Sequence, residues 1–591
     1  MKWCFWGICM MMVLPWSSAA QVIRTVGGVG ADYVTLKSAF NDINSGLVQG
    51  EILLSITGNT VESEVATLSA SGQGGAVYTR LTMFPAQPGL NISGNINGPL
   101  IHFNGADMVT IDGRVNGSGA RDLVIANSST GTSASTLYIS GGASGDTVRY
   151  CVIKGATKCT ISGVVHFGGA GVTANTGNVI DHCLITRDAA GMPVNLIYSY
   201  GSTMKPNSAT ISCNELCDFY SNTGNAHAMY INSYSDYWDV HHNSIYQTSP
   251  VAAANVTLFG FRNTGGTGIR VFSNFVGGSG AELVGNPWSI SGTGAIRFVG
   301  ISVIALPGSV SEVFDNRIGH FSWSSTSCSG SLPGIWTGIW IRGGSSNVGI
   351  LGGNIIGATT GTGNVTIISN CGGMIVSSFG IATHTTGSGD VDIRNNLVGS
   401  VTVGCTSAAS GTGHRFTGIQ VNYGGSRIIN NQIGSLETAR SIQALSGQVT
   451  TSVSNSQDLA GIHCTYPGSG GLVIEGNLIS NLFNDWQVTG SGMGMTRGIV
   501  VSSCTGDLTI RGNTVREISS SSNNTAGGSS EALTGILVTS TPAALNLSGN
   551  LVSGLSLTTT AENPVRLAGI MIAGTSADRK STRLNSSHGK L

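Results

Sequence analysis

The sequence contains little charge and no excess of either sign. Of its 591 residues, 28 are Lys or Arg and 29 are Asp or Glu, so the formal net charge is -1. This balance argues against a nucleic-acid partner, because nucleic-acid-binding proteins present a strongly basic face. Intrinsic disorder is excluded too, since 40% of the residues are hydrophobic and disordered chains combine low hydrophobicity with high net charge. The 87 glycines follow no strict three-residue period, which excludes collagen.

A long apolar run occurs only at the N-terminus. Lys2 precedes an apolar stretch over residues 4–16, and small residues follow up to Ala20. This order is typical of a secretory signal peptide, so we predict a signal peptide at 1–20 and a secreted or cell-surface protein. The run is shorter than the ~20 residues that a spanning helix needs, and no later segment is apolar enough to cross a bilayer. We therefore predict no transmembrane segment.

The C-terminal residues differ in composition from everything before them. Residues 578–588 resemble the translation of a common sequencing-library adapter. We interpret 578–591 as non-native and expect the natural protein to continue beyond this point. The predicted organisation is an N-terminal cap with the first strands at 21–100, followed by a repeat domain at 101–577 that is truncated at its C-terminal end.

A Gly-Ile phrase repeats through the second half of the chain. It occurs at Gly300, Gly338, Gly380, Gly418, Gly461, Gly498, Gly535 and Gly569. An Asn in a strand-like apolar setting follows most copies, and the full series is Asn214, Asn243, Asn274, Asn316, Asn354, Asn396, Asn431, Asn477, Asn513 and Asn550, at intervals of 29–46 residues. Such intervals are typical of solenoids and propellers.

Within each repeat the apolar residues alternate with a period of two, and no helical stripe separates the repeats. Three short strands per repeat, joined by tight turns, predict an all-β fold, a right-handed parallel β-helix. We expect the Asn series to be structural, because Asn tolerates the left-handed conformation at a sharp bend and its amide can bond its copy one coil away. The pattern at 32–44 predicts a short amphipathic helix that covers the N-terminal end of the coil.

The cysteines fall at equivalent places of successive repeats. Cys328, Cys371 and Cys405 lie in equivalent loops, so two of them can form a disulfide if the protein is exported. Cys151 and Cys183 occupy the Asn position in earlier repeats, where we expect buried thiols. No pair of CxxC motifs indicates a zinc module.

The predicted helix, the segment Val109-Thr-Ile-Asp-Gly-Arg114 and the Asn series resemble the pectin-lyase-like parallel β-helix superfamily. The first 150 residues, including the segment from Val148 to Lys154, resemble large exported β-helix proteins carried by type IX secretion. The resemblance implies the fold, and it implies a polysaccharide lyase or glycoside hydrolase as one candidate activity.

The strings expected of such an enzyme are missing. The sequence has no Asp-Asp and no Gly-His-Gly, and Asp181, Asp239, Asp315 and Asp392 lie in separate repeats. We therefore predict no catalytic centre.

Residues 27–35 match one copy of a calcium-binding nonapeptide, but such sites need tandem copies, so Ca²⁺ is left as an unsupported alternative. Asp181-His182 and, two coils later, Asp239 with His241-His242 also offer metal ligands, but such pairs at turn edges are more often hydrogen-bonded structural groups. We therefore predict no cofactor and no metal.

One strand face remains as a candidate binding surface. If the Ile of each phrase points inward, the next residue points outward, and this rule selects Tyr198, Tyr230, Arg262, Trp340 with Arg342, His384, Asn422 and His463. Aromatic and hydrogen-bonding side chains without carboxylates suit a polysaccharide or cell-surface glycan. We predict an adhesive or glycan-binding monomer. The alternatives are an enzyme of the superfamily and a passive stalk for a missing C-terminal module.

Overall fold

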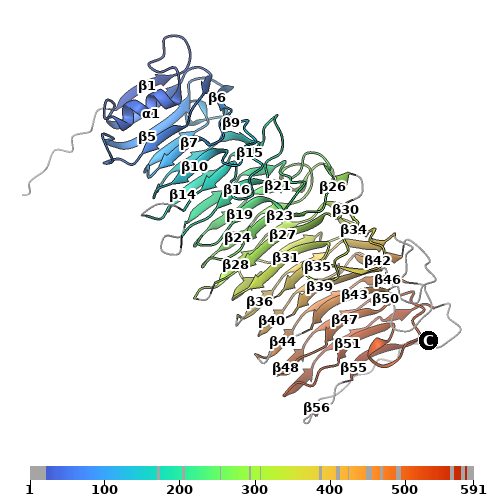
Figure 1. Cartoon of the computed structure of the whole chain (residues 1–591). Helices are drawn as coiled ribbons and strands as arrows, with labels where there is room; N and C mark the ends of the chain where they lie inside the picture. Colours follow the sequence, from blue (N-terminus) through green and yellow to red (C-terminus); the bar gives the residue numbers. More distant parts are fainter. Residues whose placement is uncertain are drawn as a thin grey trace, which may run out of the picture.

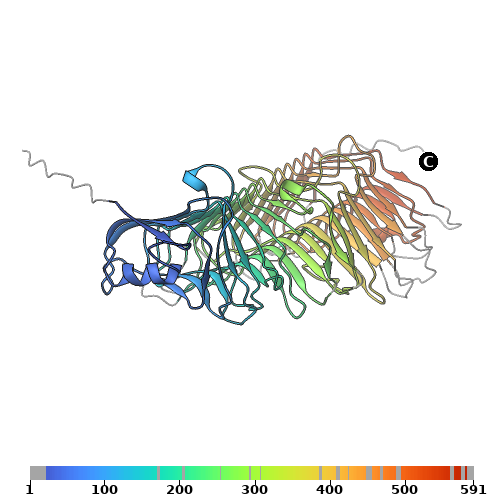
Figure 2. The same cartoon turned by 90° about the horizontal axis from the view of Figure 1, so that it is seen from above.

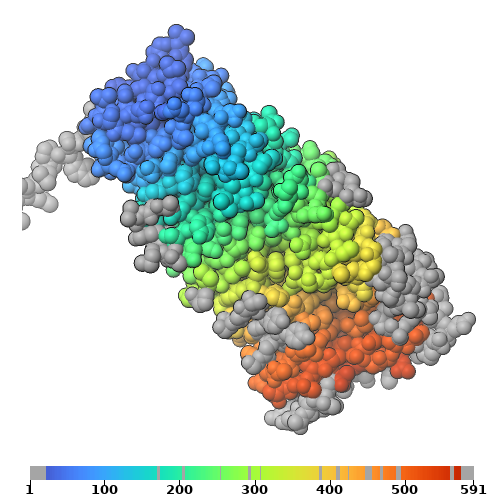
Figure 3. Space-filling model, viewed as in Figure 1, coloured from blue at the N-terminus to red at the C-terminus, as the bar shows by residue number. Residues whose placement is uncertain are grey.

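The computed structural model in Figure 1 describes most of the chain. The described residues are 21–169, 173–202, 207–252, 254–291, 294–306, 308–384, 389–406, 413–422, 425–446, 456–465, 470–486, 494–559, 565–573 and 579–581. The predicted signal peptide at 1–20 lies outside them, as does the predicted non-native segment except for 579–581. The chain forms an all-β, right-handed parallel β-helix, elongated along the stacking direction (Figures 1 and 3).

Sheet 1, with 17 strands among the described residues, begins each coil. Its strands, in stacking order, are β1 (Val22–Val26), β2 (Gly50–Ile56), β5 (Tyr78–Pro85), β8 (Val109–Asp112), β11 (Thr147–Arg149), β14 (Asn178–Asp181), β17 (Ala209–Ser212), β20 (Asp239–His241), β24 (Arg270–Phe272), β28 (Ser311–Phe314), β32 (Ser346–Val348), β36 (Val391–Arg394), β40 (Ser426–Ile429), β44 (Leu472–Glu475), β48 (Leu508–Arg511), β52 (Leu545–Ser548) and β56 (Arg579–Ser581).

Sheet 2 follows sheet 1 across a sharp bend and has 15 described strands. They are β3 (Thr60–Glu62), β6 (Leu90–Gly94), β9 (Leu123–Asn127), β12 (Cys151–Gly155), β15 (Leu184–Arg187), β18 (Glu215–Cys217), β21 (Ser244–Tyr246), β25 (Phe275–Val276), β29 (Arg317–Ile318), β33 (Ile355–Gly357), β37 (Leu397–Gly399), β41 (Gln432–Ile433), β45 (Leu478–Ser480), β49 (Thr514–Arg516) and β53 (Leu551–Ser553).

Sheet 3 contains the Gly-Ile phrases and also has 15 described strands. They are β4 (Ala66–Ser69), β7 (Pro99–Asn104), β10 (Ser135–Ser140), β13 (Val165–Phe167), β16 (Asn195–Ser199), β19 (Ala226–Ile231), β23 (Thr257–Asn263), β27 (Arg297–Ile304), β31 (Trp336–Gly343), β35 (Ile375–Thr383), β39 (Gly413–Val421), β43 (Ser456–Cys464), β47 (Thr496–Val501), β51 (Leu533–Val538) and β55 (Leu567–Ile572).

A fourth sheet corrects the prediction of three strands per repeat. From residue 251 onward, a strand between sheets 2 and 3 enlarges each coil, in the segment whose length varies between repeats. Its nine described strands are β22 (Val251–Ala252), β26 (Trp288–Ser291), β30 (Phe321–Ser325), β34 (Val365–Ser369), β38 (Val401–Cys405), β42 (Ile442–Ser446), β46 (Leu482–Asp485), β50 (Ser519–Ser520) and β54 (Ser556–Leu557). The variable length and Ser/Thr-rich composition of this segment are typical of loops, which is why the sequence pattern does not predict the extra strand.

Helix α1 (Leu36–Asn44) lies at the N-terminal end of the solenoid (Figures 1 and 2). It begins four residues later than the predicted 32–44, because Thr35 caps it by accepting a hydrogen bond from the Ser38 N–H. Its apolar side, with Phe40 and Ile43 buried, packs on β3 and β4. Three short 3₁₀ helices complete the described structure: η1 (Val115–Gly117), η2 (Ala281–Leu283) and η3 (Gly528–Ser530).

The predicted asparagine ladder is present at every step from Asn214 to Asn550. In each described coil the side-chain oxygen of the next Asn accepts from both the backbone N–H and the amide of the previous one; for Asn316 and Asn354 the distances are 3.1 and 2.9 Å. Cys183, one coil earlier, donates its backbone N–H to Asn214. The thiols of Cys151 and Cys183 are buried, as expected.

The predicted left-handed conformation belongs to a different residue. At the bend, the residue immediately before the ladder Asn has positive φ in nine of the ten coils, with 55° at Cys213, 56° at His242 and 65° at Gly476; Gly353 is the exception. The ladder Asn itself does not, so its selection rests on the hydrogen bonds and not on backbone tolerance.

The glycine of the Gly-Ile phrase is required by close packing. A Cβ on Gly380 would lie 2.5 Å from the Gly418 carbonyl oxygen and 2.8 Å from the Val398 side chain of sheet 2. The same pair of contacts recurs at Gly260, which is followed by Phe261 in place of Ile, and at the phrase glycines from Gly300 to Gly535. Only glycine lets sheets 2 and 3 approach this closely, which explains why the phrase repeats.

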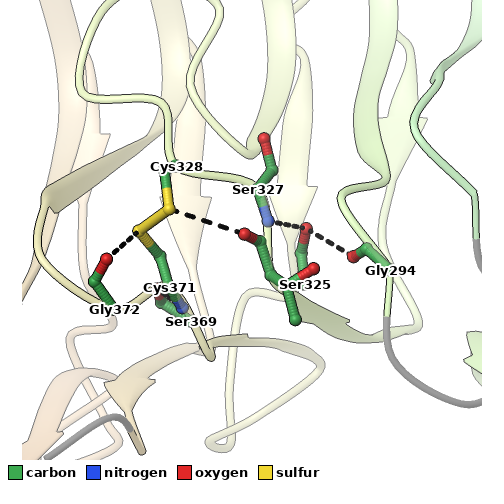
Figure 4. The surroundings of a disulfide bond; sticks show 8 residues. Gly294, Ser325, Ser327, Cys328, Ser369, Cys371 and Gly372 are labelled. Carbon is green, nitrogen blue, oxygen red and sulfur yellow. Dashed lines mark hydrogen bonds between the residues drawn. A yellow bond between two sulfur atoms is a disulfide. The ribbon is translucent and has the colours of Figure 1, made fainter. Parts of the chain in front are cut away.

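One predicted disulfide is formed. Cys328 and Cys371, 43 residues apart and on successive coils, are joined by a disulfide bond beside sheet 4 (Figure 4). Cys405, the third candidate, is a buried free thiol.

Candidate functional site

The outward residues of sheet 3 form a continuous row along the long axis. We call this the outer row; strand register aligns in it His102, Tyr138, His166, Tyr198, Tyr230, Arg262, Ser302, Trp340, Ala382, Gln420 and His463. The predicted residues Tyr198, Tyr230, Arg262, Trp340 and His463 therefore lie in one row.

Three predicted residues lie beside the outer row. Register places Ala382, not His384, between Trp340 and Gln420, so the assignment of His384 to the row is wrong. Arg342, His384 and Asn422 each lie two residues beyond an outer-row position. Arg342 lies within β31, whose alternation sets it on the outward face, whereas His384 and Asn422 immediately follow the ends of β35 and β39.

The row starts three coils earlier than the sequence suggested. His102, Tyr138 and His166 lie in coils before the Asn series, which begins at Asn214, so the repeat pattern did not extend to them. A different signal was available: each is an aromatic ring residue between two apolar ones, as in Leu137-Tyr138-Ile139.

The rings of this first half contact one another from coil to coil. The centroid distances between successive rings are 4.8 Å for His102–Tyr138 and 4.7 Å for Tyr138–His166. They are 5.2 Å for His166–Tyr198 and 5.5 Å for Tyr198–Tyr230. The Arg262 guanidinium then lies 5.0 Å from the Tyr230 ring centre. These spacings follow from the distance of about 4.8 Å between neighbouring strands.

The row is more buried than a solvated strand face. Tyr198 is 2% exposed, and Ser302 and Ala382 are fully buried, so these positions do not form a flat open platform. Tyr230, Arg262, Trp340 and His463 are half-buried. The accessible part of the row is therefore interrupted.

The histidines of the row are neutral at physiological pH. Burial lowers the pKa of His102, His166 and His463 to about 4. His102 Nε2 hydrogen-bonds Ser140 Oγ at 2.8 Å, and His463 Nε2 hydrogen-bonds Ser502 Oγ at 3.0 Å. These rings can bond hydroxyl groups but contribute no positive charge.

Arg262 is fixed by a buried histidine. The Nδ1 of His227 hydrogen-bonds the Asn195 side-chain oxygen at 2.7 Å, which assigns the proton to Nδ1. The other ring nitrogen, Nε2, then accepts from Arg262 Nη1 at 3.2 Å. Burial and the Arg262 charge hold the pKa of His227 well below its usual range, so the ring stays neutral.

Four buried polar atoms around Arg262 have no hydrogen-bond partner among the described residues. They are Arg262 Nε, Ser302 Oγ, Trp340 Nε1 and Arg342 Nη1, from the adjacent strands β23, β27 and β31. We call these four residues the donor cluster. The described residues contain 23 such unpartnered atoms in all, and this group is distinguished by two guanidinium groups that lie two coils apart, beside a Trp and a Ser.

The donor cluster is also positively charged without a counter-ion. Neither Arg262 nor Arg342 takes part in a salt bridge with a described carboxylate. Burial lowers the pKa of Arg342, and the nearby Arg262 lowers it further. The Arg342 guanidinium lies 4.8 Å from the Trp340 ring centre, which offsets part of this repulsion.

The second half of the row is satisfied internally. Gln420 Nε2 donates to Asn422 Oδ1 at 2.7 Å and to Thr465 Oγ1 at 3.0 Å. The amide groups of Gln420 and Asn422 are therefore less available to a ligand than those of the donor cluster.

The scattered carboxylates do not assemble into an acid–base pair. Asp181, Asp239 and Asp392 lie on β14, β20 and β36, and Asp315 follows β28. Asp239 and Asp392 are paired with Arg270 and Arg394. Asp32, in the calcium-like nonapeptide, accepts instead from the backbone and hydroxyl of Thr25 at 2.8 and 2.7 Å.

Comparisons with known proteins add no family. No protein-family model matches the chain, and no curated protein sequence matches it either. Among the described residues, no helix is long and apolar enough to span a membrane.

Proposed function

We propose that this chain is an exported β-helix protein that binds a polysaccharide containing uronate groups along the outer row, without cleaving it. The observation that supports this proposal is the donor cluster: four buried, unpartnered polar atoms and two guanidinium groups without a carboxylate. A uronate carboxylate supplies the missing acceptors and the missing negative charge together, and charge-assisted bonds of this kind are strong.

A polymer suits the row better than a small anion. Apart from the buried Tyr198, the ring residues from His102 to Tyr230 are partly exposed and extend over several coils on the N-terminal side of the donor cluster. Half-buried aromatic edges and neutral imidazoles can contact sugar faces and hydroxyl groups along this length. The donor cluster then fixes the charged sugar, and the ring residues extend the contact.

Export is proposed from three features. The predicted signal peptide 1–20 directs the chain out of the cytosol, and the Cys328–Cys371 disulfide is typical of an oxidising compartment. The N-terminal resemblance adds the further proposal that the chain is a pectin-lyase-like, type IX secretion cargo protein at the cell surface.

The carboxylates Asp239 and Asp392 are paired with arginines, and this pairing supports binding over catalysis.

The test is a panel of polyuronates and neutral glycans incubated with the purified chain. We expect polyuronate binding with no new reducing ends and no unsaturated products, and weaker binding in Trp340→Ala and Tyr230→Ala. Tyr237→Ala, an exposed tyrosine beside sheet 1, is the matched control and should bind normally. Product formation would show an enzyme, and absence of binding to every glycan would leave the stalk alternative.

A further inference from the structure

A second cluster of reactive side chains lies on the bend between sheets 1 and 2, away from the outer row. Asp181 ends β14, His182 follows it, and Cys213 holds the equivalent bend position one coil later. One ligand atom from each of the three lies within 4.8 Å of the others, and all three residues are partly exposed.

The Asp181 carboxylate is directed to this cluster. Its Oδ2 hydrogen-bonds His182 Nδ1 at 2.7 Å, and its Oδ1 accepts from the Ser212 hydroxyl at 2.7 Å. The neighbouring guanidinium of Arg149 is paired with Asp112 instead. Among the described salt bridges, Asp181 therefore pairs with His182 alone.

The His182 ring is held in place from the other side. Tyr150, one coil earlier at the same bend position, stacks on it with a centroid distance of 4.6 Å and an interplanar angle of 16°. The stacked ring therefore holds His182 Nδ1 facing the Asp181 carboxylate, where a metal ion would take the place of the shared proton.

Cys213 differs from the other free cysteines. All ten cysteines after the predicted signal peptide are described, and of the eight without a disulfide only Cys213 is partly exposed. Its φ of 55° is shared by this bend position in neighbouring coils, because Tyr150, His182 and His242 hold it with φ of 52°, 52° and 56°. Its partial exposure sets Cys213 apart from the seven buried free thiols.

We propose that Asp181, His182 and Cys213 bind a divalent transition metal of the zinc class. A thiolate, an imidazole and a carboxylate form the mixed donor set that zinc accepts. Zinc ligand bonds of about 2.0–2.3 Å require the three side chains to close in by about 1 Å, which partly exposed side chains can do. Three protein ligands leave a fourth position to water or to a ligand atom.

The test uses Co²⁺ as the spectroscopic substitute for Zn²⁺ on the full chain, with the Cys213 thiol first verified by mass spectrometry. We expect one Co²⁺ per chain, a cobalt–thiolate charge-transfer band in the near ultraviolet, and loss of the band on adding Zn²⁺. Cys213→Ser and His182→Asn should lose the band, and Asn is chosen because it tolerates the φ of 52° at this position.

Two matched variants control for fold and residue type. Cys405→Ser removes another free thiol, and His320→Asn replaces another left-handed histidine, with φ of 62°. Both should keep the band, and circular dichroism should show that every variant is folded. The proposal is overturned if folded wild-type chain gives no band, or if the band survives in Cys213→Ser or His182→Asn.

Discussion

The asparagine ladder makes the most quantitative prediction, and Asn354 in the middle of it is the best position to test. Asn354 is fully buried, and its side chain takes part in four hydrogen bonds. It accepts from the backbone N–H and the amide of Asn316 at 3.1 and 2.9 Å, and it donates to Val313 O and Asn396 Oδ1 at 2.9 and 2.8 Å.

The cost of Asn354→Ala follows from what each partner retains. Val313 O still accepts from the Gly349 N–H, Asn396 Oδ1 still accepts from the residue 354 N–H, and the Asn316 amide still donates to two carbonyls. The Asn316 backbone N–H is left with no acceptor, at about 1–3 kcal/mol. The other three hydrogen bonds of the Asn354 side chain are lost as well, and each contributes about 0.5–1 kcal/mol net to stability. We therefore expect Asn354→Ala to lower the free energy of unfolding by about 3–5 kcal/mol.

Asn347→Ala is the matched control, because Asn347 lies on β32 in the same coil. Its amide donates to Glu312 at 2.8 Å on the partly exposed face, so its loss should cost less than about 1 kcal/mol. Urea denaturation followed by circular dichroism measures both. If Asn354→Ala loses no more stability than Asn347→Ala, the ladder is not the structural element described above.

Two further predictions use the same denaturation assay. Gly380→Ala should lower the free energy of unfolding by about 1–3 kcal/mol, because the new Cβ meets the Gly418 carbonyl and Val398. Gly569→Ala is the control: nothing lies within 4 Å of its new Cβ, so it should change the free energy of unfolding by under about 0.5 kcal/mol. Equal effects of the two substitutions would contradict the explanation that close packing requires the phrase glycine. Burial lowers the pKa of His414 from 6.5 to about 4, so its protonation favours the unfolded chain: stability should be complete above pH 6.5 and should fall as the pH decreases toward 4. His414→Gln should reduce the stability difference between pH 7.5 and 4.5, and an unchanged difference would show that this histidine is not the group responsible.

The Gly-Ile phrase and the Asn series were enough to predict the solenoid, because each follows from a physical constraint of the fold. The glycine is required by the close approach of sheets 2 and 3, and the Asn is required by the hydrogen bonds at the bend. Sheet 4 was not predicted, since segments such as 519–531 vary in length and lack strong apolar alternation. Its strands are set by pairing with the coil below more than by local sequence.

The candidate site was predicted only in part. Alternation placed Tyr230, Arg262 and Trp340 on one outward face, and the register confirms their alignment. Burial of Tyr198 and the internal bonds of Gln420 depend on contacts between coils, which a single repeat does not encode. The same holds for the cluster at Asp181 and Cys213, whose members are 32 residues apart in sequence.

The most direct test of the central claim is a titration of the chain with an oligomeric uronate at low salt. The double substitution of Arg262→Gln and Arg342→Gln should weaken binding at least about tenfold, since each charge-assisted hydrogen bond contributes about 1.5–3 kcal/mol. Arg270→Gln and Arg394→Gln, which break arginine–aspartate pairs on sheet 1, should leave the affinity unchanged. Wild-type affinity in a folded double variant would contradict the account.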